Sequence, residues 1–331
     1  ETKMAKLQRA VVNLVSDTVT RPSAAMRQVI AAAEVGDDVY SADPSVNRLQ
    51  QVAAERLGKQ AALYVPSYVP DPLSLLGTPA YMGVSLSTIP NQTDGTLQIR
   101  DMANAIRSDD PHYPISKLVA LENTQNTCGG RVLPVSYVRE VEQFCQQHDL
   151  RLHVDGARLS NASVALGVPM AELVAGADSV SLCLSKGLGA PVGSILAGSE
   201  EFIYKAKRLR KSLGGGMRQA GVIAAAGLFA LENQFDRLAE DHTNAKELAH
   251  GLANIPGIEI RPEDVETNIL FFQLAPDAKL DAPTLVEKLE SEKGILFGGY
   301  WNGGRIRAVT NLHVSPKDVE YTVASIRELL A

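Results

Sequence analysis

The sequence has few cysteines, few aromatic side chains and no long run of apolar residues. Its three cysteines, Cys128, Cys145 and Cys183, are far apart and form no C-x-x-C pair. This spacing argues against a disulfide framework and a zinc site, so we expect a reducing compartment and no metal. No segment approaches the roughly 18–20 continuous apolar residues that a membrane helix needs, so we expect no membrane partner.

Runs of one charge are also lacking. The 32 Lys and Arg residues and 38 Asp and Glu residues give a net charge of -6, and no Lys/Arg run is present. We therefore expect no nucleic-acid partner. The charged N-terminal stretch 1–12 lacks the apolar region of a signal peptide. This favours a cytoplasmic protein, or a mitochondrial one if a targeting peptide was removed.

What is present is an alternation of strand and helix patterns. Apolar runs predict buried strands at 117–122, 151–155 and 178–184. The helical spacing of apolar residues predicts helices at 135–147 and 161–176. Successive strands begin about thirty residues apart, which is the length of a βαβ unit and predicts a parallel sheet covered by helices.

The remainder of the chain predicts a second, smaller domain. Helical patterns at 200–213 and 219–255 are followed by a mixture of short strands and helices. Because single cores stop growing near ~250–300 residues, a chain of 331 residues is expected to divide. We predict an α/β fold with an N-terminal arm and helix (1–45), a large domain with a mostly parallel sheet (46–240) and a small C-terminal α/β domain (241–331).

Charged residues follow two of the predicted strands. Asp155 is the last residue of the strand 151–155 and Arg158 follows it, and Lys186 comes after the strand 178–184. In open α/β sheets, ligands bind beyond the carboxyl ends of the strands. A lysine that can form a Schiff base, with a carboxylate that keeps a pyridine nitrogen protonated, is what a pyridoxal phosphate site requires. The sequence therefore predicts this cofactor, with Lys186 and Asp155 as catalytic residues.

Six ordered motifs then identify a family. The sequence resembles the L-threonine aldolases of low specificity, within the β-eliminating lyase branch of the fold-type I pyridoxal phosphate enzymes. The motifs are LVSDTVTRPSAAM (14–26), EVGDDVYSADPSVNRLQ (34–50), LHVDGARLSNA (152–162), CLSKGLGAPVGSILAGS (183–199), SLGGGMRQAGVIAAAG (212–227) and IRAVTNLHVS (306–315).

The resemblance implies roles for particular residues. Its cofactor-binding residues would be Lys186, Asp155, Arg158, Lys211, Arg218 and Ser67. Its substrate-binding residues would be Ser16, Arg158, Arg307, Gln125 and Tyr40. A guanidinium suits this second task because it binds a carboxylate through two parallel hydrogen bonds. His153, on the same strand face as Asp155, is expected to be a core histidine or a neighbour of the site rather than a catalytic base.

Two departures from the family fall near the expected site. The segment 68–90 is shorter than the family's and contains no histidine. It is either a true deletion or a gap in this sequence, and we favour the gap. Gln125 stands where the family commonly has a histidine near the substrate hydroxyl.

The resemblance implies cleavage of L-threonine or L-allo-threonine to glycine and an aldehyde. The substrate would be a small amino acid, and the assembly a homotetramer of two dimers with active sites at the subunit interfaces. The residues leave two alternatives open. One is β-elimination from another amino acid, or its racemisation, and the other is a catalytically silent relative.

Overall fold

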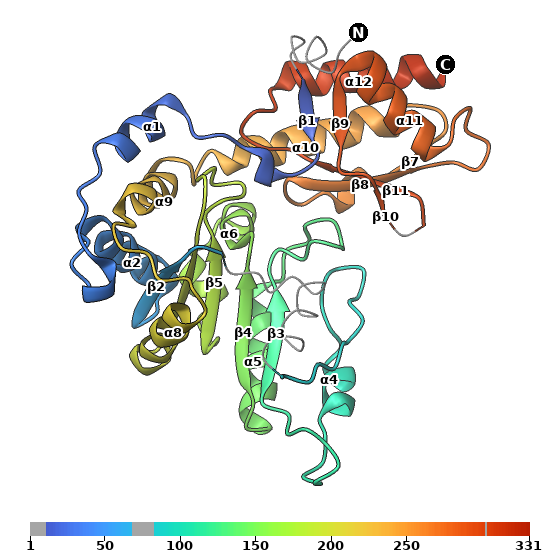
Figure 1. Cartoon of the computed structure of the whole chain (residues 1–331). Helices are drawn as coiled ribbons and strands as arrows, with labels where there is room; N and C mark the ends of the chain where they lie inside the picture. Colours follow the sequence, from blue (N-terminus) through green and yellow to red (C-terminus); the bar gives the residue numbers. More distant parts are fainter. Residues whose placement is uncertain (1–10, 68–82, 302) are drawn as a thin grey trace. The chain divides into compact units, whose positions relative to one another are not determined.

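The computed structural model describes residues 11–67, 83–301 and 303–331 (Figure 1). The chain divides into two compact units. The larger is Arg21–Phe235, and the smaller combines the residues up to Thr20 with Asp236–Ala331. The structure thus groups the first residues of the predicted N-terminal arm with the C-terminal unit and divides the chain at 235/236. The three predicted domains, with boundaries after residues 45 and 240, stay a prediction.

The larger unit is built on a five-stranded sheet in the order β2-β6-β5-β4-β3. β3, β4 and β5 pair in parallel, whereas β6 is antiparallel to both of its neighbours. The three strands predicted from the sequence are confirmed as β3, β4 and β5. The strands are β2 (Ala61–Val65), β3 (Leu118–Glu122), β4 (Arg151–Gly156), β5 (Ser179–Cys183) and β6 (Ser194–Gly198).

Register places polar side chains together on one face of this sheet. Glu122 of β3 pairs with Asp155 of β4, which pairs with Ser181 of β5. Residues in register on neighbouring strands point to the same face, so these three side chains lie in a row. The row continues through Leu196 of β6 to Leu63 of β2. This face is therefore apolar toward β2 and polar toward β3.

Helix α8 packs on the apolar part of that face. Leu63, Leu196 and Ile203 of α8 belong to one buried cluster. Helices α2, α5, α6 and α7 also pack against the sheet or against one another (Figure 1). The helices of this unit are α1 (Ala24–Ala31), α2 (Pro44–Leu57), α4 (Ile99–Ala105), α5 (Val135–Gln147), α6 (Leu159–Leu166), α7 (Met170–Leu173), α8 (Glu200–Ser212), α9 (Gly221–Asn233) and the 3-10 turn η3 (Asp38–Tyr40).

The single helical stretch expected at 219–255 is wrong, because the chain forms two helices there. α9 ends at Asn233, and four residues (234–237) separate it from α10 (Leu238–Ala253), which begins beyond the boundary between the units. The side chain of Phe235 lies beneath the guanidinium of Arg56, 5.4 Å from ring centroid to carbon. No glycine or proline lies at 234–237, so the sequence pattern predicted one continuous helix across the break.

The smaller unit contains two small sheets and their covering helices. β1 (Val12–Leu14) pairs in parallel with β9 (Ile295–Phe297). An antiparallel sheet has the order β10-β11-β8-β7. Its strands are β7 (Ile258–Glu259), β8 (Ile269–Leu274), β10 (Tyr300–Trp301) and β11 (Arg305–Val309).

Three helices and short turns complete the smaller unit. α12 (Pro316–Leu330) begins with a capping box, in which the Ser315 side chain accepts from the Asp318 amide and Asp318 accepts from the Ser315 amide. The mixture of short strands and helices predicted for this part of the chain is confirmed by elements such as β8, β11 and α12. The other elements are η2 (Asp17–Val19), η4 (Pro262–Asp264), α11 (Ala282–Lys288) and a π-helical turn, Leu289–Lys293.

Candidate functional site

Asp155 is held as an acceptor at the carboxyl end of β4. Its Oδ1 accepts hydrogen bonds from the amide of Ala157 at 2.9 Å and from Oγ of Ser181 at 3.3 Å. The side chain is buried, with 4% of its surface exposed. Donors that point at a carboxylate stabilise its charged form. Asp155 is thus suited to face a cationic group.

Lys186 lies in the turn that joins β5 to β6. Backbone hydrogen bonds close this turn, from Gly189 to the Lys186 carbonyl at 2.8 Å and from Leu184 to the Gly193 carbonyl at 3.0 Å. Gly189 has a φ of +75°, a conformation that glycine adopts without strain. Lys186 is half-buried, and its positive charge acts on Glu122, at the end of β3. Lys186 and Asp155 therefore belong to one rim of the larger unit.

The loops after β3 and β4 bring Gln125 and Arg158 to this rim. Arg158 is buried, and its guanidinium donates to Oδ1 of Asn126 at 3.5 Å. Gln125 is also buried, and its Oε1 accepts from the amide of Cys128 at 2.8 Å and from Oγ1 of Thr127 at 3.0 Å. The amide of Gln125 thus holds the loop, and its predicted contact with substrate stays a prediction.

Glu122 is a residue of this rim that the sequence reasoning missed. It is half-buried, and its Oε2 accepts from Nε2 of Gln125 at 3.2 Å and from the amide of Asn126 at 3.3 Å. Burial and the neighbouring Asp155 raise the pKa of Glu122 to about 7. The signal was its position, because Glu122 ends a strand beside the one that carries Asp155.

Tyr40, Lys211 and Arg218 lie on another part of the larger unit. Arg218 forms an ion pair with Asp37 at 2.7 Å, and Tyr40 is 77% exposed. The neighbouring Asp38 is buried in an ion pair with Arg210, whose guanidinium also donates to the Tyr64 carbonyl. This buried pair, which the sequence reasoning also missed, fixes η3 against α8 and β2.

Lys211 packs over the glycine triplet that follows α8. A Cβ added to Gly216 would stand 2.8 Å from Cδ of Lys211, so glycine permits this close approach. Lys211 and Arg218 are both exposed. Lys211, Arg218 and Tyr40 thus face solvent in the single chain. Their predicted roles in binding cofactor and substrate stay predictions.

Ser67 and the short segment lie at the edge of what the structure describes. Ser67 is exposed and stands two residues after β2 ends. Of the segment 68–90, residues 68–82 lie outside the described residues. Residues 83–90 form no helix or strand, and all but residue 89 are exposed.

The segments that carry Ser16 and Arg307 come together within the smaller unit, although 290 residues separate the two residues. A Cβ added to Gly298 would stand 2.7 Å from the Val15 carbonyl oxygen and 3.5 Å from the Arg307 carbonyl oxygen. The Gly298 amide donates to that same Arg307 carbonyl at 3.1 Å. Glycine at 298 therefore lets the residues after β1, which include Ser16, approach β11, which carries Arg307. Arg307 is buried and Ser16 is half-buried.

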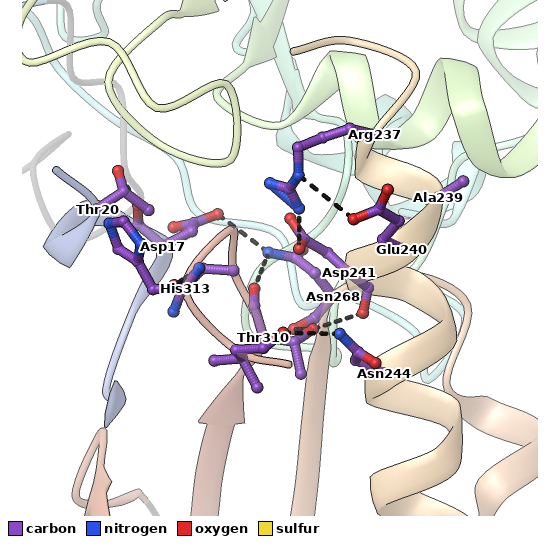
Figure 2. A network of polar contacts seen from close by, with 12 residues as sticks. Asp17, Thr20, Arg237, Ala239, Glu240, Asp241, Asn244, Asn268, Thr310 and His313 are labelled. Carbon is purple, nitrogen blue, oxygen red and sulfur yellow. Dashed lines mark hydrogen bonds and ion pairs between the residues drawn. The ribbon is translucent and has the colours of Figure 1, made fainter. Parts of the chain in front are cut away.

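A buried polar network fixes the segment that carries Ser16 (Figure 2). Asn268 donates from Nδ2 to Oδ2 of Asp17 at 3.2 Å and to the Thr310 carbonyl at 3.2 Å. Oγ1 of Thr310 donates to the backbone carbonyl of Asp241 at 2.6 Å, and the Asp241 carboxylate pairs with Arg237. Asp17, Asn268, Thr310 and Asp241 are fully buried. The network joins the residues after β1, before β8, after β11 and at the start of α10.

His153 is buried beneath the rim. Its Nδ1 lies 2.8 Å from Oγ of Ser179, and burial lowers the pKa of the imidazole to about 4. The ring is therefore neutral at neutral pH, as expected of a core histidine. Among the described residues, the three cysteines form no disulfide.

Two hollows of the described part lie away from the residues predicted from sequence. One of about 410 Å³ lies in the smaller unit beside Asn244, Glu240 and His313. Another of about 530 Å³ lies between α1, α2 and α9 in the larger unit. Among the described residues, no group of His, Cys, Asp and Glu could hold a metal ion, and no helix is long and apolar enough to cross a membrane.

Comparisons with known proteins converge on one family. Residues 13–68 and 76–275 match the family described as beta-eliminating lyase. The low-specificity L-threonine aldolase 1 of Arabidopsis thaliana is 43% identical and covers 96% of both chains. The low specificity L-threonine aldolase of Escherichia coli (strain K12) is 40% identical, over 97% of this chain and 100% of that one.

Solved structures share the fold. The threonine aldolase of Leishmania major aligns with a TM-score of 0.77 over 97% of this chain and 100% of that chain, at 20% identity. An alanine–glyoxylate aminotransferase from Nostoc sp. aligns with a TM-score of 0.70 over 98% of this chain and 96% of that one, at 17% identity. The predicted α/β fold class is confirmed by these likenesses.

Proposed function

Because this chain belongs to the β-eliminating lyase family, we propose that it is a carbon–carbon lyase that cleaves L-threonine and L-allo-threonine to glycine and an aldehyde. The family resemblance predicted from the six motifs is confirmed by the match and by relatives at 40–43% identity. The observation that carries the proposal is the rim of the larger unit, where Asp155 lies at the end of β4 and Lys186 follows the neighbouring strand β5.

The residues of this rim suit pyridoxal phosphate. A half-buried lysine in a closed turn can bind the cofactor's aldehyde carbon, and a carboxylate held by two donors can pair with its ring nitrogen. Bound there, the cofactor would supply an electron sink for the pair released when the Cα–Cβ bond breaks. The proposal assigns Lys186, Asp155, Arg158, Lys211, Arg218 and Ser67 to the cofactor.

The protein's own part is to bind and orient the substrate. Ser16, Arg158 and Arg307 are proposed to bind the substrate carboxylate, and Gln125 and Tyr40 to lie near the rest of the amino acid. Orientation matters because a bond breaks fastest when it is aligned with the orbitals that receive its electrons. Gly298 and the network around Asn268 support this assignment, since they fix the segments that carry Ser16 and Arg307.

The test is incubation of the purified protein, loaded with pyridoxal phosphate, with L-threonine. We expect equal amounts of glycine and acetaldehyde, and a borohydride-trapped adduct on Lys186. Lys186→Ala should give neither. Bound cofactor with no glycine would overturn the proposal, and pyruvate or a D-amino acid from other substrates would favour elimination or racemisation. A protein without an adduct would be a silent relative.

The assembly and location remain part of the proposal. We propose a homotetramer of two dimers in the cytoplasm, with small amino acids as the ligands. Light scattering coupled to size-exclusion chromatography measures the subunit number directly. A monomer that cleaves threonine at full rate would contradict shared active sites.

A further inference from the structure

Glu122 stands beside Asp155 on the rim that carries Lys186. The two are in register on the parallel strands β3 and β4, so both side chains point to the same sheet face. Asp155 is 4% exposed, whereas Glu122 is half-buried. Of these two neighbouring carboxyl groups, Glu122 is therefore the more accessible.

The loop after β3 fixes the Glu122 carboxyl group. Its Oε2 accepts from Gln125 at 3.2 Å and from the Asn126 amide at 3.3 Å. Gln125 is itself held by Thr127 and by the amide of Cys128. An amide side chain does not take up a proton at neutral pH, but it can orient a carboxylate that does. Gln125 thus positions Glu122.

The charges that face Glu122 act in opposite directions. Burial and the negative charge of Asp155 raise the pKa of Glu122, whereas the Asn126 amide, Arg158 and Lys186 lower it, and the result is about 7. A group that is partly ionised near neutral pH is best suited to accept and release protons. Two carboxyl groups with different surroundings are a common way to separate an electrostatic role from a proton-transfer role.

Other candidate bases in the larger unit are less suitable. His153 is neutral at neutral pH but buried, and its Nδ1 is engaged by Ser179. His112 is exposed in the loop before β3, and His148 follows α5 and packs on Phe144. The imidazoles of this unit are thus either buried or placed away from the ends of β4 and β5.

We propose that Glu122 is the proton acceptor for the β-hydroxyl group of the substrate. This rests on the proposed aldolase function. The hydroxyl proton moves to the Glu122 carboxylate, the oxygen's electron pair forms the aldehyde C=O bond, and the Cα–Cβ bond breaks. The bound cofactor would supply the sink for the electron pair of that bond. Cα then takes up a proton from solvent, and Glu122 releases its proton to solvent. One amino acid thus gives one glycine and one aldehyde.

The test compares the wild-type protein with Glu122→Gln, which resembles the protonated group in shape. In the cofactor-free protein, carboxyl-labelled glutamate followed by ¹³C NMR should show one group that titrates near pH 7, and Glu122→Gln should lack it. In the loaded enzyme, kcat should rise with pH through this range and reach a plateau. Glu122→Gln should lower kcat about 100-fold or more, with KM little changed, and remove that rise.

Two further variants serve as controls. Glu122→Asp should restore part of the activity and keep a pH-dependent rise. Glu140→Gln, an exposed glutamate on α5, should leave kcat, the pH profile and the near-neutral NMR titration unchanged.

The outcomes separate this inference from the proposed function. If the wild-type protein makes no glycine from threonine, the proposed function fails. If it does, and Glu122→Gln keeps full kcat, the inference alone fails. A lower kcat with an unaltered pH profile would also overturn it, because Glu122 would then only support the loop.

Discussion

Each unit of the protein places two carboxyl groups close together, and the two pairs differ in their surroundings. In the larger unit, Glu122 and Asp155 lie in register at a sheet edge, and Glu122 is half-buried beside Lys186 and Arg158. In the smaller unit, Asp17 and Asp241 are fully buried among Asn268, Thr310 and Arg237. Glu122, the accessible member of the first pair, suits chemistry, whereas the fully buried carboxyl groups joined to strand and helix ends suit positioning.

The largest effect that distinguishes the two regions should come from Asp155→Asn. Removing the negative charge, while keeping a side chain that accepts from Ala157 and Ser181, should lower kcat about 100- to 1,000-fold, because the charge proposed to pair with the cofactor would be lost. Stability should change little. Steady-state kinetics and urea unfolding measure the two. Asp149→Asn, at an exposed position of the same unit, is the control and should change neither.

Asp241→Ala should lower the stability of the protein and leave kcat almost unchanged, which is the reverse of the effect expected for Asp155→Asn. It leaves the Arg237 guanidinium, which is 19% exposed, without its buried partner, and we expect a loss of about 2–3 kcal/mol in the free energy of unfolding. At saturating substrate, kcat per folded molecule should stay near the wild-type value. Glu240→Ala removes the other, exposed partner of Arg237 at 3.8 Å and should cost less than about 0.5 kcal/mol. Equal losses in the two variants would contradict a positioning network that depends on Asp241.

Sequence reasoning found the strands of the larger unit because their apolar runs were continuous and regularly spaced. It also placed Asp155 and Lys186 at strand ends, since a residue at the end of a predicted parallel strand is fixed by the fold. It did not find Glu122, because the register between β3 and β4 decides its neighbours, and register cannot be read from one strand alone. The buried pair of Arg210 with Asp38 joins residues 172 positions apart, so nothing local signalled it.

The break between α9 and α10 and the place of β1 were missed for a related reason. Both depend on how the chain passes between units, which no glycine or proline marks at 234–237. β1 has only three residues and gains its partner, β9, from the opposite end of the chain. The approach of Ser16 to Arg307 through Gly298 is a consequence of that pairing. Long-range pairing therefore accounts for most of what the sequence did not reveal.

A pH titration compares the cores of the two units. His153 and His242 are each buried, one in each unit, and burial lowers the pKa of both to about 4, with Lys246 adding to the effect at His242. The unfolded chain takes up a proton below about pH 6.5 while the folded one does not, so stability should fall as pH drops from 6.5 toward 4. Each histidine should cost about 2 kcal/mol at pH 5.

Single substitutions test whether the two buried histidines cause this loss of stability at low pH. His153→Asn and His242→Asn should each reduce the difference in unfolding free energy between pH 7.5 and pH 5. His250→Asn, at an exposed position of α10, should leave that difference unchanged. If neither buried substitution reduces it, the two imidazoles take up protons in the folded state and the assignment is wrong.

The smallest effect should come from Ser181→Ala, which removes the hydroxyl donor to Asp155. The lost hydrogen bond is 3.3 Å long and the 2.9 Å bond from the Ala157 amide remains, so the carboxylate should keep its charge and most of its orientation. We expect kcat to fall only a few-fold, in line with about 1 kcal/mol for one hydrogen bond. Ser179→Ala is the matched control, because this serine lies on the same face two residues earlier and contacts His153 instead. It should leave kcat unchanged. If Ser181→Ala instead reduced kcat as much as Asp155→Asn, the hydroxyl group itself would have to act on the reacting molecule, and the division of roles between Asp155 and Glu122 would need to include a third side chain.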